Sequence, residues 1–202
     1  EVAPPEDLPA VVWIGASIHG DEGSGADAAL ALLYHLAADR SERTRQVMNN
    51  LLILIDPMQN PDGRAHFLSE VEQWSGRIPG LDPQSLTHRT GWPSARGNHY
   101  QLDLNRDWFV LSQPETRAVV QVIQRWHPQV TIDLHEMGSS DTYLMSPPRY
   151  PINPNVPART REWWKRFSTD QAAAFGARGW SCYTGDWNEE FSPNRGASWT
   201  LH

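Results

Sequence analysis

Histidine and carboxylate residues cluster in the stretch "SIHGDEGSG", which directly follows an apolar run near the start of the chain. His19 and Glu22 are three positions apart in it, where a predicted strand gives way to a predicted helix. Imidazole nitrogens and carboxylate oxygens are ligands of zinc in catalytic sites. Taken alone, the pair fits a helix start better than a metal site, with Glu22 in the positive field of the helix N-terminus. A third ligand is therefore needed to favour a metal site.

His135 supplies that third candidate, because it follows another apolar run, "VTIDL". Two histidines and one glutamate leave a coordination position open for water, whose pKa a catalytic zinc lowers to about 7. A ligating histidine also needs a carboxylate or carbonyl on its other ring nitrogen, and Asp103 and Asp133 are candidates. We therefore predict one zinc ion per chain, bound by His19, Glu22 and His135.

Polar side chains between these ligands are suited to binding an anionic substrate. Asn105 and Arg106 lie in the turn "LDLNRDW", where an arginine fork and an amide donor can grip a carboxylate. Taken alone, Arg106 could instead pair with Asp107 and brace the loop. Arg89 and Arg96 lie upstream, and one of them could polarise a scissile carbonyl and hold its oxyanion. The sequence leaves the choice between those two arginines open.

Three apolar runs, 10–16, 51–55 and 130–134, predict strands buried on both faces. Helices are expected at 26–38, after 112–115 and at 158–177. The second of these should start with a capping box of Ser112 and Glu115, with Pro114 in its first turn. "NPDGR" at 60–64 indicates a turn, and 69–100 a long irregular segment. This order predicts an α/β fold whose largely parallel central sheet has helices on both faces, with the polar clusters at the carboxyl ends of its strands.

Composition narrows the classes of partner. The chain has 202 residues, 39% of them hydrophobic, and we expect one catalytic domain over 1–202. Its net charge of -7 makes nucleic acid an unexpected partner. No apolar run approaches the roughly 20 residues that span a bilayer. A single cysteine, Cys182, excludes an internal disulfide and a cysteine-based zinc site. The sequence does not predict the oligomeric state. We expect the protein to be periplasmic or secreted.

These motifs together resemble the M14 family of zinc carboxypeptidases, and their exact residue patterns are similar to those of a bacterial branch of that family. The resemblance rests on His19-x-x-Glu22, "NPDG", Asn105-Arg106 and His135. It implies a zinc carboxypeptidase-like fold, a zinc ion on His19, Glu22 and His135, and a peptide substrate. It also implies that Asn105 and Arg106 grip the terminal carboxylate, that Arg89 or Arg96 assists the carbonyl, and that Asp103 supports the first histidine.

The C-terminal end departs from the family pattern. "NRGASWTLH" resembles the segment that precedes the family's general-base glutamate, and the sequence stops there at His202. Glu189 and Glu190 do not match the family position, so no general base is found in this chain. We expect a truncated piece of a longer enzyme, which by itself can be inactive.

Two alternatives to a carboxypeptidase stay open from sequence. The aspartoacylase and desuccinylase group has a similar zinc site and cleaves small acyl-amino acids. A non-catalytic zinc- or peptide-binding fragment is the other, because the expected glutamate is missing. "NPDGR" and the tryptophan-rich loop favour the peptidase.

Overall fold

The computed structural model describes residues 8–78, 80–82, 84–88, 91, 93–138, 141–145, 147 and 150–184. The chain divides into two compact units, Glu1–Glu136 and Met137–His202, and each is described by itself.

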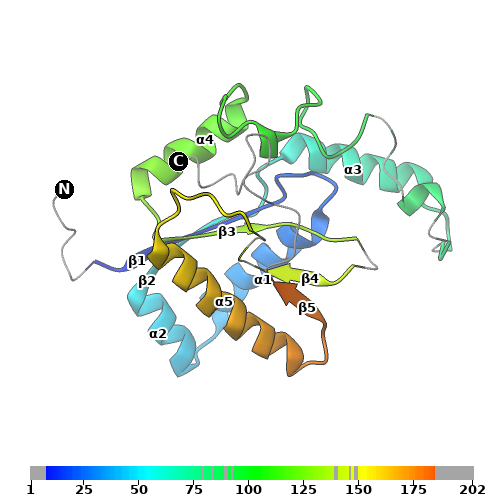
Figure 1. The fold of residues 1–202 in the computed structure, drawn as a ribbon. Helices are drawn as coiled ribbons and strands as arrows, with labels where there is room; N and C mark the ends of the chain where they lie inside the picture. Colours follow the sequence, from blue (N-terminus) through cyan, green and yellow to red (C-terminus); the bar gives the residue numbers. More distant parts are fainter. Residues whose placement is uncertain are drawn as a thin grey trace. The chain divides into compact units, whose positions relative to one another are not determined.

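A three-stranded parallel sheet forms the centre of the first unit (Figure 1). Its strands are β1 (Ala10–Ala16), β2 (Leu51–Asp56) and β3 (Val130–Leu134), in the order β2-β1-β3. Gly15 of β1 is in register with Asp56 on one side and Asp133 on the other. The three predicted strands are thus confirmed, and their carboxyl ends lie at one edge of the sheet.

Helices cover both faces of this sheet, as the sequence predicts. In Figure 1, α1 and α2 lie on one side of the sheet, and α3 and α4 on the other. The helices are α1 (Gly23–Ala38), α2 (Glu42–Asn50), α3 (Pro61–Trp74) and α4 (Pro114–Trp126), with short 3-10 turns η1 (Leu86–His88) and η2 (Leu104–Arg106). Helix α1 starts three residues earlier than expected, and α2 was not predicted.

The "NPDGR" segment begins a helix, so its interpretation as a turn was wrong. Asn60 is the N-cap of α3, and its side-chain oxygen accepts a hydrogen bond from the Gly63 N–H. Pro61 is the first helical residue, where its missing N–H costs nothing. Asparagine, proline and glycine are typical of turns and of helix starts alike, and here the helix continues to Trp74.

The capping box predicted for α4 is also wrong, because another carboxylate takes its place. The N-cap is Gln113, without a side-chain cap bond. Asp107 instead accepts hydrogen bonds from the backbone N–H groups of Ser112 and Gln113, both at 2.8 Å, and from the hydroxyls of Ser112 and Thr116. Pro114 does occupy the first turn, as predicted. The loop before α4 is therefore fastened to the helix by one carboxylate.

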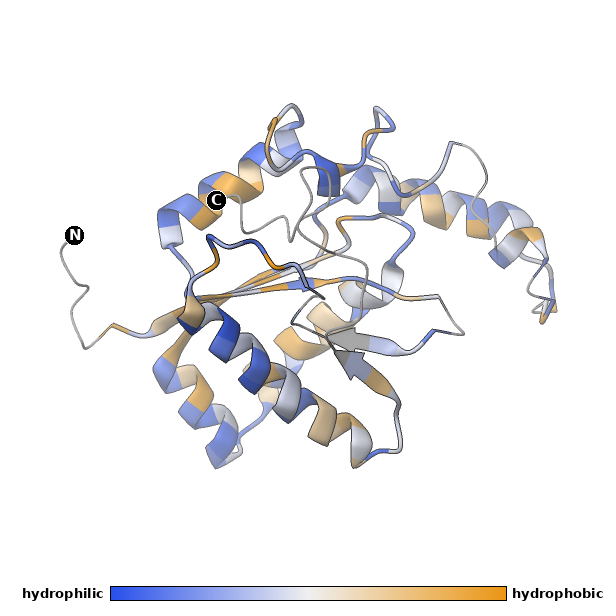
Figure 2. Ribbon diagram, in the orientation of Figure 1, coloured by the Kyte–Doolittle hydropathy of each residue, from blue (hydrophilic) through white to orange (hydrophobic). Residues whose placement is uncertain are grey.

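The hydrophobic core of the first unit lies between the sheet and its helices. Buried side chains come from β1, α1, α4 and the loops: Trp13, Ile14, Ala16, Ile18, Ala26, Ala29, Leu104, Trp108, Val119 and Val120. Helix α4 carries both hydrophobic and hydrophilic residues (Figure 2), and Val119 and Val120 are its buried valines. Burying a valine contributes about 1.5–3 kcal/mol. Leu104 and Trp108 extend this core beneath the polar loop that carries Asn105.

The second unit is smaller and contains two short strands and one long helix. Strands β4 (Tyr143–Met145) and β5 (Cys182–Thr184) pair in parallel, and α5 runs over Ala158–Gly176. The predicted helix at 158–177 is thus confirmed, whereas the two strands were not predicted. Tyr143, Phe175 and Trp180 form an aromatic cluster with ring centroids 4.7–6.1 Å apart. Among the described helices, none combines the length and hydrophobicity needed to cross a membrane.

We expect Asp107→Asn to lower the free energy of unfolding by about 1–3 kcal/mol, because an amide leaves buried donors without an acceptor. Burial raises the pKa of Asp107, but the hydrogen bonds from Ser112 and Thr116 outweigh it and hold the pKa below its usual value. The charged carboxylate therefore stabilises the fold above about pH 4, and this contribution is lost as the pH falls through the lowered pKa. Urea unfolding at pH 7, 5 and 3 measures the effect.

The difference between wild type and Asp107→Asn should shrink at pH 3. Asp27→Asn, at a side chain that is 78% exposed, is the matched control and should change stability little. Equal stability of wild type and Asp107→Asn at pH 7 would contradict this role.

Candidate metal centre

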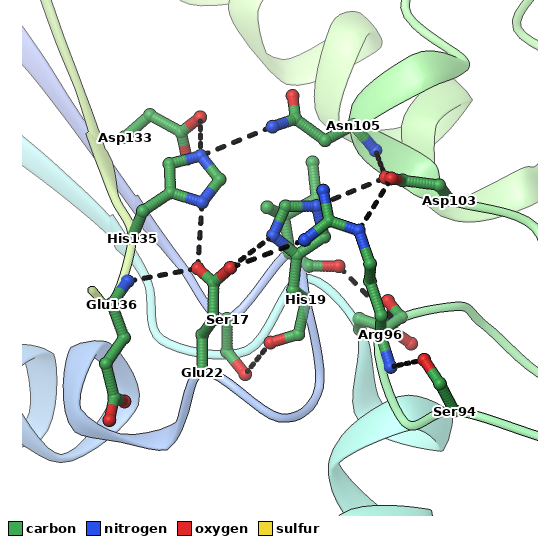
Figure 3. A network of polar contacts seen from close by, with 12 residues as sticks. Ser17, His19, Glu22, Ser94, Arg96, Asp103, Asn105, Asp133, His135 and Glu136 are labelled. Atoms are coloured by element: carbon green, nitrogen blue, oxygen red, sulfur yellow. Dashed lines mark hydrogen bonds and ion pairs between the residues drawn. The ribbon is translucent and has the colours of Figure 1, made fainter. Parts of the chain in front are cut away.

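The three predicted zinc ligands come together at the carboxyl edge of the sheet (Figure 3). His19 and Glu22 lie between β1 and α1, and His135 follows β3. One ligand atom from each of the three lies within 4.8 Å of the others. The Glu22 carboxylate is 2.6 Å from His19 Nδ1 and 2.8 Å from His135 Nδ1. Among the described residues, these three are the group arranged to hold a metal ion.

A second carboxylate lies beside the Nε2 atom of each imidazole. His19 Nε2 is 3.1 Å from Asp103 Oδ1, and His135 Nε2 is 2.9 Å from Asp133 Oδ2. Such partners fix the orientation of a ligating ring and make its other nitrogen a better ligand. Both histidines thus turn Nδ1 toward Glu22 and Nε2 toward an aspartate. This donor set fits zinc, with two imidazoles, one carboxylate and an outer carboxylate for each ring.

The same contacts shift the pKa values of His19, Glu22 and His135. Burial lowers the pKa of His135, but hydrogen bonds with Asp133 and Glu22 outweigh it and raise the pKa to about 10. Burial also lowers the pKa of His19, yet its bonds to Asp103 and Glu22 leave that pKa above the usual value. Burial raises the pKa of Glu22, and the two histidines together bring it down to about 2. At pH 7 these contacts therefore favour a protonated His135 and an ionised Glu22, and they stabilise the protonated form of His19 relative to a free imidazole.

Arg96 is the upstream arginine that the structure places at this centre. Its Nε is 2.9 Å from Asp103 Oδ2, and its Nη1 is 3.7 Å from Glu22 Oε1. Because Asp103 binds both Arg96 and His19, it fixes a cation beside the first ligand. Arg89, the other candidate, lies outside the described residues, as do Glu189 and Glu190.

Asn105 lies beside the third ligand, and Arg106 is exposed next to it. The Nδ2 atom of Asn105 is 3.3 Å from His135 Nε2, and its backbone N–H donates to Asp103 Oδ1 at 2.9 Å. Arg106 donates through Nη1 to the carbonyl of Asn105, and its side chain faces solvent. Asp107 binds the start of α4, so the alternative pairing with Arg106 is not the arrangement found.

Asn60 holds the loops around the centre together, and the sequence analysis missed this role. The side chain is fully buried, and its Nδ2 lies 3.1–3.2 Å from the carbonyls of Ile18, Arg96 and Gly97. It thereby links the loop that carries His19 to the loop that carries Arg96. The "NPDG" motif was the available signal, but a turn motif does not tell which carbonyls its asparagine contacts.

Gly20 allows the closest approach of these loops. A Cβ at Gly20 would lie 2.0 Å from the carbonyl carbon of Gly63 and 2.5 Å from the carbonyl oxygen of Ala95. No side chain fits between these backbones, so the glycine after His19 is required by packing. Ser17, three residues before Gly20, is fully buried and has a left-handed φ of 56°, which turns the chain sharply after β1.

A sequence profile described as zinc carboxypeptidase matches residues 5–190. The chain belongs to the zinc carboxypeptidase (M14 peptidase) family. Across 95% of its length it is 26% identical to the carboxypeptidase N catalytic chain of Rattus norvegicus, of which it covers 46%. It is also 26% identical to the probable carboxypeptidase 2 of Trichophyton verrucosum over 132 residues, which are 65% of this chain and 20% of that protein.

Solved structures agree on the fold of this carboxypeptidase-family chain. The metallo-carboxypeptidase of Burkholderia cenocepacia superposes with a TM-score of 0.62 at 19% identity, over 93% of this chain and 43% of that one. The carboxypeptidase A of Helicoverpa armigera gives a TM-score of 0.57 at 17% identity, over 90% and 46%. The chain thus spans less than half the length of these relatives, and the family resemblance drawn from the motifs is confirmed.

Zinc binding should release protons at pH 7, including the one on His135, because a ligating imidazole must be neutral. The pKa values of both rings are raised, so protons compete with zinc and zinc affinity should increase from pH 6 to pH 8. Calorimetric titration in buffers of different ionisation enthalpy counts the protons.

Replacing one ligand, in His135→Gln, should weaken zinc binding and lower the number of released protons by about one. His35→Gln, at a largely exposed histidine in the last turn of α1, is the control and should bind zinc like wild type. A binding enthalpy that is the same in every buffer would contradict the predicted protonation.

Proposed function

We propose that the protein is a zinc-dependent carboxypeptidase that hydrolyses the C-terminal peptide bond of peptides. One observation carries the proposal: His19, Glu22 and His135 converge on one point, with Arg96 and Asn105 beside them. A bound zinc ion would supply a Lewis acid that polarises the scissile carbonyl and lowers the pKa of a water molecule. The roles of the surrounding side chains follow from their contacts.

Arg96 is suited to stabilise negative charge that develops on the carbonyl oxygen. Its side chain is 41% exposed, so part of it remains open to a substrate, while Asp103 holds its Nε in place. A cation that is already oriented stabilises the transition state without rearrangement. Removing one such donor typically costs 100- to 1000-fold in kcat.

Asn105 and Arg106 are suited to bind the terminal carboxylate of a peptide. Asn105 presents an amide beside His135, and Arg106 presents an exposed guanidinium one residue further along η2. A carboxylate bound here would place the last peptide bond near the metal ligands. This selects hydrolysis at the chain end over hydrolysis within a chain.

We do not assign the general base to the carboxylates at the centre. Glu22, Asp103 and Asp133 each bind one or two imidazoles, and their charges orient the ligand rings. Protonating any of them during turnover would disturb the ligand that it supports. Glu22 therefore serves as a ligand, and Asp103 and Asp133 orient the two ligand rings.

We expect the zinc-loaded protein to release the last residue from N-acylated dipeptides. Arg106→Met should raise KM about 10- to 100-fold, because a hydrogen bond to a charged group contributes about 1.5–3 kcal/mol. Arg125→Met, at an exposed arginine in the last turn of α4, is the matched control and should leave KM unchanged.

The same assay separates the two alternatives. Release of acetate or succinate from acyl-amino acids, without peptide cleavage, would replace the proposal by the aspartoacylase and desuccinylase activity. Binding of zinc and of peptides without turnover of either substrate would indicate a binding module.

A further inference from the structure

We propose that Trp108 is a positioning residue that sets which end of the Asn105 amide faces the substrate. The inference deepens the proposed function and rests on it. Trp108 Nε1 donates a hydrogen bond to Asn105 Oδ1 at 2.9 Å. Trp108 is the last residue of the "LDLNRDW" stretch, three residues after Asn105, and the sequence analysis gave it no role.

The bond fixes the polarity of the amide, because an indole nitrogen can only donate. The atom of Asn105 that faces Trp108 must therefore be the oxygen. The NH2 group then points the other way, and its nitrogen lies 3.3 Å from His135 Nε2 (Figure 3). Trp108 thus turns Asn105 into a donor at the centre.

The partner of His135 makes this orientation matter. Nε2 of His135 lies 2.9 Å from Asp133 Oδ2, so its hydrogen goes to that carboxylate. The NH2 group of Asn105 and this N–H are both donors, so their contact does not itself fix the amide. A reversed amide would bring its oxygen beside Nε2 and compete with Asp133 for the same hydrogen. It would also turn an acceptor toward an incoming carboxylate and repel it. Trp108 disfavours both consequences through one hydrogen bond.

Trp108 is anchored well enough to hold Asn105. It is 2% exposed and belongs to the core beneath the loop, together with Leu104. The 3-10 turn η2 ends at Arg106, and the turn after it brings the Trp108 indole within hydrogen-bond distance of Asn105. The backbone of Asn105 is held separately, by its N–H bond to Asp103. The loop is therefore fixed by other contacts, and the indole N–H sets the direction of the amide.

The consequence is selectivity for a free carboxylate. A donor amide binds a terminal carboxylate, whereas an amide free to reverse can also accept from a terminal carboxamide. Trp108 should therefore favour peptide acids over peptide amides. This selectivity belongs to substrate binding and not to the chemical step.

The test is Trp108→Phe in the zinc-loaded protein, assayed on an N-acylated dipeptide and on its C-terminal amide. We expect KM for the acid to rise about 3- to 10-fold, as for the loss of one neutral hydrogen bond, with kcat and zinc affinity nearly unchanged. The preference for acid over amide should fall by a similar factor. In an Asn105→Ala background the same substitution should change KM little, because the amide through which it acts is gone.

Trp126→Phe, at the partly exposed end of α4, is the matched control and should match wild type. Should Trp108→Phe fail to fold, β-(3-benzothienyl)alanine at position 108 keeps the ring shape and removes only the N–H donor. Unchanged KM and unchanged preference would overturn the inference. An equal rise in KM on adding Trp108→Phe to wild type and to the Asn105→Ala variant would also overturn it.

A failure of the proposed function can be distinguished from a failure of the role proposed for Trp108. If wild type cleaves no peptide, calorimetric binding of an N-acyl amino acid and of its amide tests Trp108 separately. Weaker binding of the acid by Trp108→Phe, with unchanged binding of the amide, supports the positioning role. Equal binding of the acid by wild type and variant overturns it.

Discussion

The contact on which the site depends is the Glu22 carboxylate between two imidazoles. It lies 2.6 Å from His19 Nδ1 and 2.8 Å from His135 Nδ1, while Asp103 and Asp133 hold the opposite nitrogens. Three carboxylates and two imidazoliums would carry a net charge of -1, and the same carboxylates with one zinc ion and two neutral rings would carry the same charge. A metal that displaces a proton from each ring would thus leave the local charge unchanged. Arg96 lies beside Glu22 and Asp103 and offsets part of their negative charge.

Close backbone packing makes this arrangement possible. Asn60 connects the carbonyls of Ile18, Arg96 and Gly97, and Gly20 admits Gly63 and Ala95 at distances that no side chain would allow. The β1–α1 loop, the start of α3 and the loop before η2 are therefore one packed junction. The ligand His19 and the cation Arg96 keep their separation because their backbones are fixed to the same asparagine.

The sequence predicted the elements whose signals are local and strong. The apolar runs that became β1, β2 and β3 end in polar clusters, and parallel strands bring those ends to one edge, so His19, Glu22 and His135 could be placed together. The contacts that cap α4 could not be predicted, since Asp107 reaches them from five to nine residues upstream. The position of Arg96 at the centre likewise depends on its contacts with Asp103 and Asn60, which no sequence periodicity predicts.

The central claim, that His19, Glu22 and His135 bind zinc, is tested most directly by X-ray absorption at the zinc edge of the loaded protein. The account predicts one zinc ion per chain, with two imidazole nitrogens at about 2.0–2.1 Å, carboxylate oxygen and no sulfur in its first shell. His135→Gln should remove one imidazole from that shell. A zinc shell that contains Cys182 sulfur, or one unchanged by His135→Gln, would contradict the account.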